Sequence, residues 1–382
     1  MRRLPVLLAL AAVLTAALAA GAVTASPQPL LAAVGEGSAT RLTAVDPLTL
    51  APVGRSMQIG RYVFPSARSP DGTQLVLART DRASLRVVDL RRMKTLRAFP
   101  LGGSYVDGIA WLEPRLVVAV VDGFRAVGVD PVSKRVRWRV ALPNQVESIE
   151  RSPSGFVLLV RSGEWPPSGI GPTTLLTIGA AGKLRSVLLD RIRSGADFTE
   201  TPPTVELRRP GLAVDPVGNR AFVIGAGEPF AEVDLAAMTV AYHGGSGSRS
   251  LAKAVNGPER NATWLGNGLI AVTGSDAHSV VGTKDGQSFE HVWWTPAGLT
   301  LVDTKDWSSR LIDPNATSVE VANGLLLATA WTYDSAVSAA TGIGLAAYSL
   351  DGTPRFHLLA GPVASIQAGA GMAYVRWPGE PG

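Results

Sequence analysis

The sequence contains no cysteine and only four histidines among 382 residues. The absence of cysteine excludes disulfides, thiolate nucleophiles and cysteine-ligated zinc or iron–sulfur sites. Charged residues are also few, at 18%, and the net charge of +5 is spread over single residues and pairs such as Arg91 and Arg92. Nucleic-acid binding needs a clustered basic stripe, so we expect no nucleic-acid partner.

Motifs for common cofactor and catalytic sites are lacking as well. The glycine-rich stretch 243–247 has no Lys-Ser/Thr to complete a phosphate-binding loop, and Gly245-Ser246-Gly247-Ser248 departs from the serine hydrolase pattern. We therefore expect no cofactor and no metal ion.

Long apolar runs are absent except at the N-terminus. There Arg2 and Arg3 precede an apolar stretch over 4–23, and small residues lead up to Ala25. This pattern is typical of a secretory signal peptide, which we assign to residues 1–25. The protein is then secreted or extracytoplasmic, with no membrane span after signal removal. The alternative is an uncleaved anchor, because about 20 apolar residues just span a bilayer.

The rest of the chain is built from short β-branched runs separated by turns. Hydrophobic residues make up 46% of the sequence, which also has 41 Gly and 27 Pro. One phrase recurs: an apolar strand that ends in Val-Asp or an equivalent, followed by a short polar turn. The closest copies are spaced like the roughly 40–45-residue blades of a propeller. The copies end at Asp46, Asp89, Asp130, Gly179, Asp234, Asp303 and Ser349.

An earlier turn in the unit repeats too. Ser69-Pro70-Asp71-Gly72 has counterparts at 152–155 and 215–218, where Ser or Asp bonds the turn and Pro presets φ. Two further units carry Asn267-Gly268 and Asn323-Gly324, a strong tight-hairpin signal.

Segments 69–78 and 86–89 resemble the repeats of the YVTN-type and WD-repeat-like β-propeller superfamily, and the resemblance extends over nearly all of 39–377. The segment 129–138 also resembles the repeat of pyrroloquinoline-quinone propellers. That family repeats its Gly and Trp in most blades, whereas this chain does so only at Trp138. Both resemblances imply a propeller.

We therefore predict an all-β fold, a seven-bladed β-propeller of four-stranded antiparallel blades. Residues 26–38 are a linker, 39–377 the single propeller domain and 378–382 a tail. Six blades are predicted at 62–99, 106–142, 146–189, 211–243, 261–312 and 317–358. Pairing of N- and C-terminal strands forms the seventh blade and removes the open edge. Its predicted strands are 39–46, 51–57, 363–368 and 371–377.

Five long insertions fall in the connections that emerge at one end of a propeller, which we call the insertion face. They are residues 162–172, 190–209, 244–260, 274–296 and 331–342. Because binding residues usually lie in loops on a rigid scaffold, this face is our binding-site hypothesis. The alternative is that the insertions merely cover the channel.

Aromatic residues in these insertions are the candidate ligand-binding side chains, because exposed rings suit stacking against a sugar or a partner surface. The alternative is that they anchor long loops to the propeller rim. The candidates are Trp165, Trp293, Trp294, Trp331 and Tyr333.

The fourth insertion also brings imidazoles and carboxylates together, as a weak candidate for a metal or acid/base site. The insertion holds Asp276, His278, Asp285, Glu290 and His291, and the metal or acid/base candidates among them are Asp276, His278, Glu290 and His291. Their spacing matches no standard ligand motif. We thus expect a monomeric, non-enzymatic scaffold that binds a protein, glycan or small-molecule ligand. The alternative is a propeller enzyme, lyase or quinoprotein-like, with its site at the channel mouth.

Overall fold

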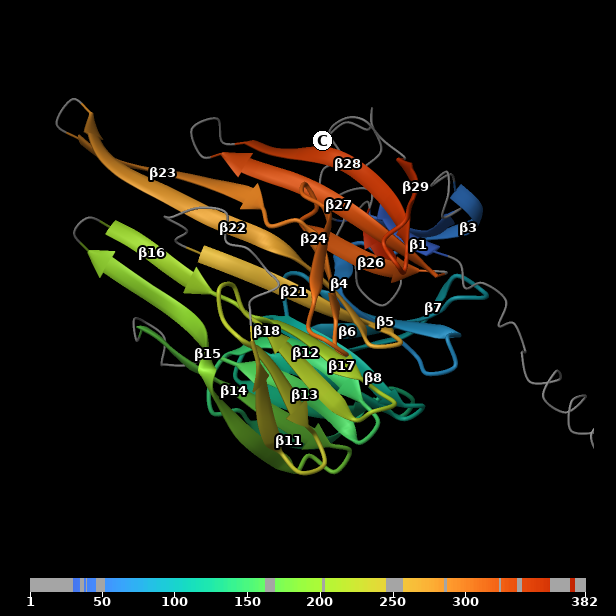
Figure 1. Ribbon diagram of the computed structural model, residues 1–382. Helices are drawn as coiled ribbons and strands as arrows, with labels where there is room; N and C mark the ends of the chain where they lie inside the picture. Colours follow the sequence, from blue (N-terminus) through green and yellow to red (C-terminus); the bar gives the residue numbers. More distant parts are fainter. Residues whose placement is uncertain are drawn as a thin grey trace, which may run out of the picture.

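The computed structural model describes residues 30–34, 38, 40–45, 52–161, 169–200, 203–244, 257–284, 287–322, 324–334, 339–357 and 372–374. Within these ranges the chain forms β-strands and turns, and no helix there could cross a membrane. The signal peptide, Trp165, Asp285, the segment 363–368 and the tail lie outside them. The strands form successive antiparallel sheets around a common centre (Figure 1).

The first three blades follow one another along the chain, each with its first strand innermost. Blade 1 contains β4 (Tyr62–Arg68), β5 (Gln74–Arg79), β6 (Ser84–Asp89) and β7 (Lys94–Pro100). Blade 2 contains β8 (Val106–Glu113), β9 (Leu116–Val121), β10 (Arg125–Asp130) and β11 (Arg135–Ala141). Blade 3 contains β12 (Val146–Ser152), β13 (Gly155–Val160), β14 (Gly169–Gly179) and β15 (Leu184–Glu200), with β16 (Pro203–Arg208) added at its edge.

The next three blades repeat this plan. Blade 4 contains β17 (Gly211–Asp215), β18 (Arg220–Ile224), β19 (Phe230–Asp234) and β20 (Thr239–His243). Blade 5 contains β21 (Gly257–Gly266), β22 (Leu269–Lys284), β24 (Leu299–Asp303) and β25 (Ser309–Asp313), with β23 (Gln287–Pro296) inserted. Blade 6 contains β26 (Ser318–Ala322), β27 (Leu325–Asp334), β28 (Ala339–Ser349) and β29 (Pro354–His357).

Within the described residues, the closing sheet contains three N-terminal strands and one C-terminal strand. Blade 7 has the order β3 (Pro52–Gln58), β2 (Arg41–Val45), β1 (Leu30–Val34) and β30 (Met372–Tyr374). Both ends therefore share one sheet, as predicted, but the two-plus-two division differs: β1 lies in the segment expected as a linker, and β30 pairs with it in parallel. The apolar run Leu30–Val34 explains the extra strand, because Leu31 is buried against blade 1.

The hydrophobic core consists of separate apolar layers between neighbouring blades. One layer joins blades 1 and 2 and the next joins blades 2 and 3, and the series continues to blades 5 and 6. Another layer joins blade 7 to blade 1. Each blade is thus apolar on both faces, which accounts for nearly continuous hydrophobic strands such as Leu116–Val121. This arrangement makes a rigid ring with its connections at two ends.

The Val-Asp phrase has a physical explanation in the turn after each third strand. The Asp89 carboxylate accepts the backbone N–H groups of the second and third residues that follow, at 2.9 Å each. Asp130 and Asp234 repeat this capping, and Asp303 caps Lys305. The repeat in the sequence is therefore a repeat of turn chemistry.

Candidate functional site

Three long hairpins extend from the insertion face. They are formed by β15 and β16, by β22 and β23, and by β27 and β28. The first two project toward the same side of the molecule (Figure 1). The predicted insertions 190–209, 274–296 and 331–342 therefore lie largely in strands rather than in irregular loops, because each strand pairs with its own return.

Two of the hairpins join each other. Strand β23 pairs with β27 through Trp293 opposite Asp334 and Trp294 opposite Tyr333. This pairing merges the extensions of blades 5 and 6 into one nine-stranded sheet. Trp331 lies in the same strand as Tyr333, opposite Gly342. The backbones of four predicted aromatic positions are thus in adjoining strands, although their sequence positions are far apart.

The side chains of Trp293 and Trp294 do not form one stacking surface. Successive residues of a strand point to opposite faces of a sheet, so these two rings lie on opposite sides. The His278 ring stacks on Trp293 at a centroid distance of 5.2 Å, and His291 lies 5.0 Å from the same indole. Both tryptophans are half-buried. Trp293 and Trp294 therefore present their rings to different surroundings.

The candidate imidazoles and carboxylates have separate partners. Asp276 forms an ion pair with Arg260 at 2.7 Å, and His278 Nε2 lies 2.9 Å from the hydroxyl of Thr295. Glu290 lies in β23 opposite Val281. Among the residues that the structure describes, no three His, Asp or Glu side chains are grouped to hold a metal ion.

A charged network that sequence reasoning missed lies at the base of the hairpins. Glu147 on β12 accepts a hydrogen bond from Arg161 Nε and lies 3.0 Å from Arg209 Nε. Arg209 also contacts Glu259 of β21, at 3.1 Å. Burial raises the pKa of Glu259, as does the nearby Glu147, while Arg209 opposes the change. The network joins blades 3, 4 and 5 and holds Arg209 in a fixed position.

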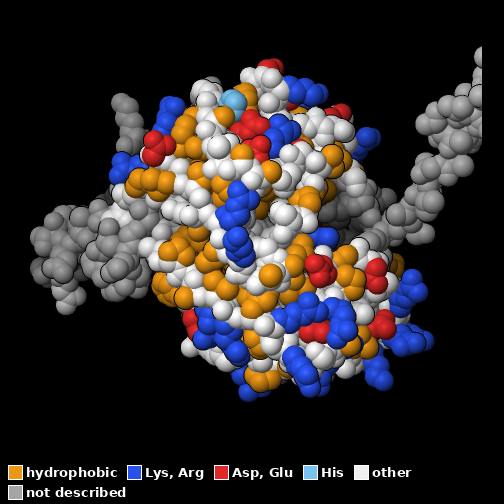
Figure 2. All heavy atoms as spheres, turned by 90° about the horizontal axis from the view of Figure 1, so that it is seen from below, with side chains coloured by type: hydrophobic (Ala, Val, Ile, Leu, Met, Phe, Trp, Pro, Cys, Tyr) orange, Lys and Arg blue, Asp and Glu red, His pale blue; other side chains and the backbone are white. Residues whose placement is uncertain are grey.

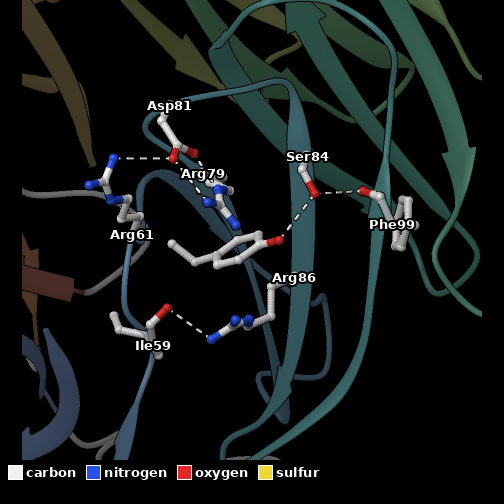
Figure 3. Close-up of polar contacts among 8 residues, drawn as sticks. Ile59, Arg61, Arg79, Asp81, Ser84, Arg86 and Phe99 are labelled. Atoms are coloured by element: carbon white, nitrogen blue, oxygen red, sulfur yellow. Dashed lines mark hydrogen bonds and ion pairs between the residues drawn. The ribbon is translucent and has the colours of Figure 1, made fainter. Parts of the chain in front are cut away.

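A second polar cluster lies in blade 1, where that blade meets blade 7 (Figure 3). The buried Tyr62 phenol lies 3.2 Å from Ser84 Oγ, and the Arg86 guanidinium lies 4.0 Å from the ring centroid. Burial by itself raises the pKa of Tyr62, yet the hydrogen bonds from Ser84 and Arg79 and the guanidinium charges outweigh it and lower the pKa.

This cluster connects blade 7 to blade 1. Arg86 donates to the carbonyl of Ile59, in the connection before β4, at 2.8 Å, and Asp81 binds both Arg61 and Arg79. The phenol and the three guanidinium groups each contact protein partners, so this arrangement stabilises the junction between the two blades.

The surface seen from below carries mixed charge. Figure 2 shows Lys and Arg side chains in small groups, with Asp and Glu and apolar side chains between them. On the described part of that face they form no single continuous stripe.

No family model and no curated protein matches the chain. Solved structures do match. A protein from Lactobacillus plantarum is 11% identical with a TM-score of 0.54, and the alignment covers 92% of this chain and 99% of that chain. A functionally unknown protein from Desulfotomaculum acetoxidans is 16% identical with a TM-score of 0.52, covering 91% and 99%. BamB from Moraxella catarrhalis is 11% identical with a TM-score of 0.46, covering 79% and 91%.

At these identities the first two matches support the fold alone. The described strands divide into seven blades, with apolar layers between successive blades from blade 1 to blade 6 and between blades 7 and 1, and with both chain ends in one sheet. The chain therefore has a β-propeller fold.

Proposed function

We propose that this chain is an exported propeller that binds a protein, glycan or small-molecule ligand on its insertion face and catalyses no reaction there. The observation that carries the proposal is the joining of β23 to β27, which turns two hairpins into one continuous sheet on the insertion face. Long paired strands on a rigid ring present a larger and better ordered surface than isolated loops do.

The alternative of a lyase or quinoprotein-like enzyme needs converging acid, base or metal-binding groups. The described candidates have other partners instead, since Asp276 is paired with Arg260 and His278 with Thr295. Trp293 and His291 are half-buried, and their rings are the aromatic groups available for stacking against a ligand. The site therefore favours binding over chemistry.

Shortening the β22–β23 hairpin is expected to weaken ligand binding at least about tenfold, because it removes area from the joined sheet. The variant replaces residues 282–289 with Asn-Gly, which closes the hairpin between the paired Val281 and Glu290. Wild type and variant are screened against glycan and peptide arrays, and hits are measured by calorimetry.

The matched control is Val217→Ser, at a 94% exposed position in the turn between β17 and β18, at the opposite end of the ring. It is expected to bind like wild type. If the shortened variant keeps full affinity for every hit and Val217→Ser loses it, the ligand binds at the other end and the proposal is wrong.

Export predicts that the mature chain begins at Ser26. N-terminal sequencing of protein from the extracytoplasmic fraction is the measurement, and Ala25→Leu is the matched variant because signal cleavage requires a small residue there. We expect Ala25→Leu to retain Met1. Recovery of wild-type protein with an intact Met1 in the membrane fraction would support the uncleaved anchor instead.

A further inference from the structure

A small pocket opens at the base of the β15–β16 hairpin, where it meets the turn between β18 and β19. It encloses about 170 Å³, including its open mouth. Much of that volume is open to solvent, so the site is a shallow recess that can contact one chemical group only at its mouth. The lining residues are Arg193, Arg208, Arg209, Pro210, Gly225, Ala226, Glu228 and Pro258.

The lining is strongly basic. Three arginines come from β15, the end of β16 and the connection to β17, whereas Glu228 is the one carboxylate among the eight lining residues. Arg209 is oriented by Glu147 and Glu259 behind it. Arg193 donates to the carbonyl of Ile170 at 3.0 Å. Guanidinium groups held in place in this way are suited to bidentate recognition of an oxyanion.

The carboxylate in the pocket is only partly compensated. Glu228 Oε1 accepts the backbone N–H of Arg193 at 3.1 Å and lies 4.0 Å from Arg208 Nη1. Its second oxygen, Oε2, is buried without a hydrogen-bond partner. A buried oxygen of this kind calls for a partner, and the proton of a neutral carboxyl group would let it donate to a bound oxyanion.

We propose that this pocket binds the oxyanion of one acidic group, a carboxylate or a phosphate, carried by the ligand of the insertion face. The inference rests on the proposed function and narrows it to an acidic ligand. The arginines supply the charge at the mouth of the recess, and Glu228 contributes a hydrogen bond when it is neutral.

The protonation of Glu228 makes binding depend on pH. Burial raises its pKa to about 7, while Arg193 and Arg208 favour the charged form. The other charged lining group is Arg209, whose charge is shared with Glu147 and Glu259. Because an ionised Glu228 repels an anion, affinity is expected to fall as the pH rises from 6 to 8.

The first experiment titrates the full mature chain with acetate and, separately, with sulfate, by calorimetry at constant ionic strength set with chloride. Acetate represents a carboxylate and sulfate a phosphate, and neither probe changes charge between pH 6 and 8. Arg193→Gln and Arg208→Gln are each expected to lower the affinity for the probe that wild type binds more tightly by about tenfold. Arg55→Gln, an exposed arginine of β3 in blade 7, removes the same charge and is expected to bind like wild type.

The second experiment titrates wild type and Glu228→Gln with the same probe at pH 6, 7 and 8. This variant stays neutral, so its affinity is expected to be constant where that of wild type falls. Equal affinities of Arg193→Gln, Arg208→Gln and wild type, or no binding of either probe by wild type, would overturn the proposal. The proposed function has its own test, in which shortening the β22–β23 hairpin weakens binding of the array ligands. Failure of the oxyanion pocket can therefore be told apart from failure of the proposed function.

Discussion

Replacing Arg260 with methionine is expected to lower the free energy of unfolding by about 3–5 kcal/mol, because it leaves a buried carboxylate without its charge partner. The Arg260 and Asp276 side chains are only 1% and 4% exposed, and Nη1 lies 2.7 Å from the carboxylate. Arg260 also donates to the carbonyl of Ser275 on β22 at 3.3 Å, so it fixes β21 against β22. Denaturant unfolding at pH 7 measures the loss.

Two further variants separate the charge effect from lost packing. Arg260→Met combined with Asp276→Leu removes both charges, and it is expected to recover most of the stability because no buried charge remains unpaired. Arg55→Met, at an exposed position in blade 7, is expected to change stability by less than about 0.5 kcal/mol. A loss below about 1 kcal/mol for Arg260→Met would show that Asp276 is compensated by other groups.

The propeller could be predicted from the sequence because each blade carries its own local turn signals. Asp89, Asp130 and Asp234 cap equivalent turns, and Asn267 and Gly268 both adopt the positive φ of a tight hairpin, at 54° and 86°. Such signals depend only on neighbours along the chain. Repetition then gives the number of blades without any knowledge of long-range contacts.

It was harder to predict that the insertions form paired hairpins, although the sequence contains a turn signal for one of them. Lys284 pairs with Gln287 at the tip of the β22–β23 hairpin, on either side of Asp285-Gly286 in the sequence. Asp-Gly between alternating strands is a hairpin signal that we interpreted only as part of a loop. The extra strand β1 was missed for a similar reason, since its short apolar run Leu30–Val34 follows the predicted signal peptide.

The charged groups beneath the hairpins could not be found from spacing at all. Glu147, Arg209 and Glu259 come from different parts of the ring, at least fifty residues apart in each step, and meet only when the blades assemble. The arginine pocket likewise requires the β15–β16 hairpin to fold back onto the turn at Gly225. Long-range assembly creates these sites, and no local motif records it.

The layer between blades 4 and 5 supports the insertion face from below, and Phe222 is its central side chain. Phe222 is fully buried, stacks on Trp264 at 5.3 Å and lies 6.0 Å from Trp307. Arg220 covers the ring at 5.5 Å. Phe222→Ala is expected to lower the free energy of unfolding by about 3–5 kcal/mol, because it removes the aromatic contacts and leaves a cavity.

Phe222→Leu is the matched control, since it keeps an apolar side chain between the two indoles. It is expected to lose markedly less stability than Phe222→Ala, by roughly the difference in residual cavity. Both variants are compared by denaturant unfolding, with oxyanion binding as a second readout, because Phe222 lines neither the pocket nor the hairpins. Equal losses for the two variants would mean that the layer depends on the aromatic stack rather than on filled volume.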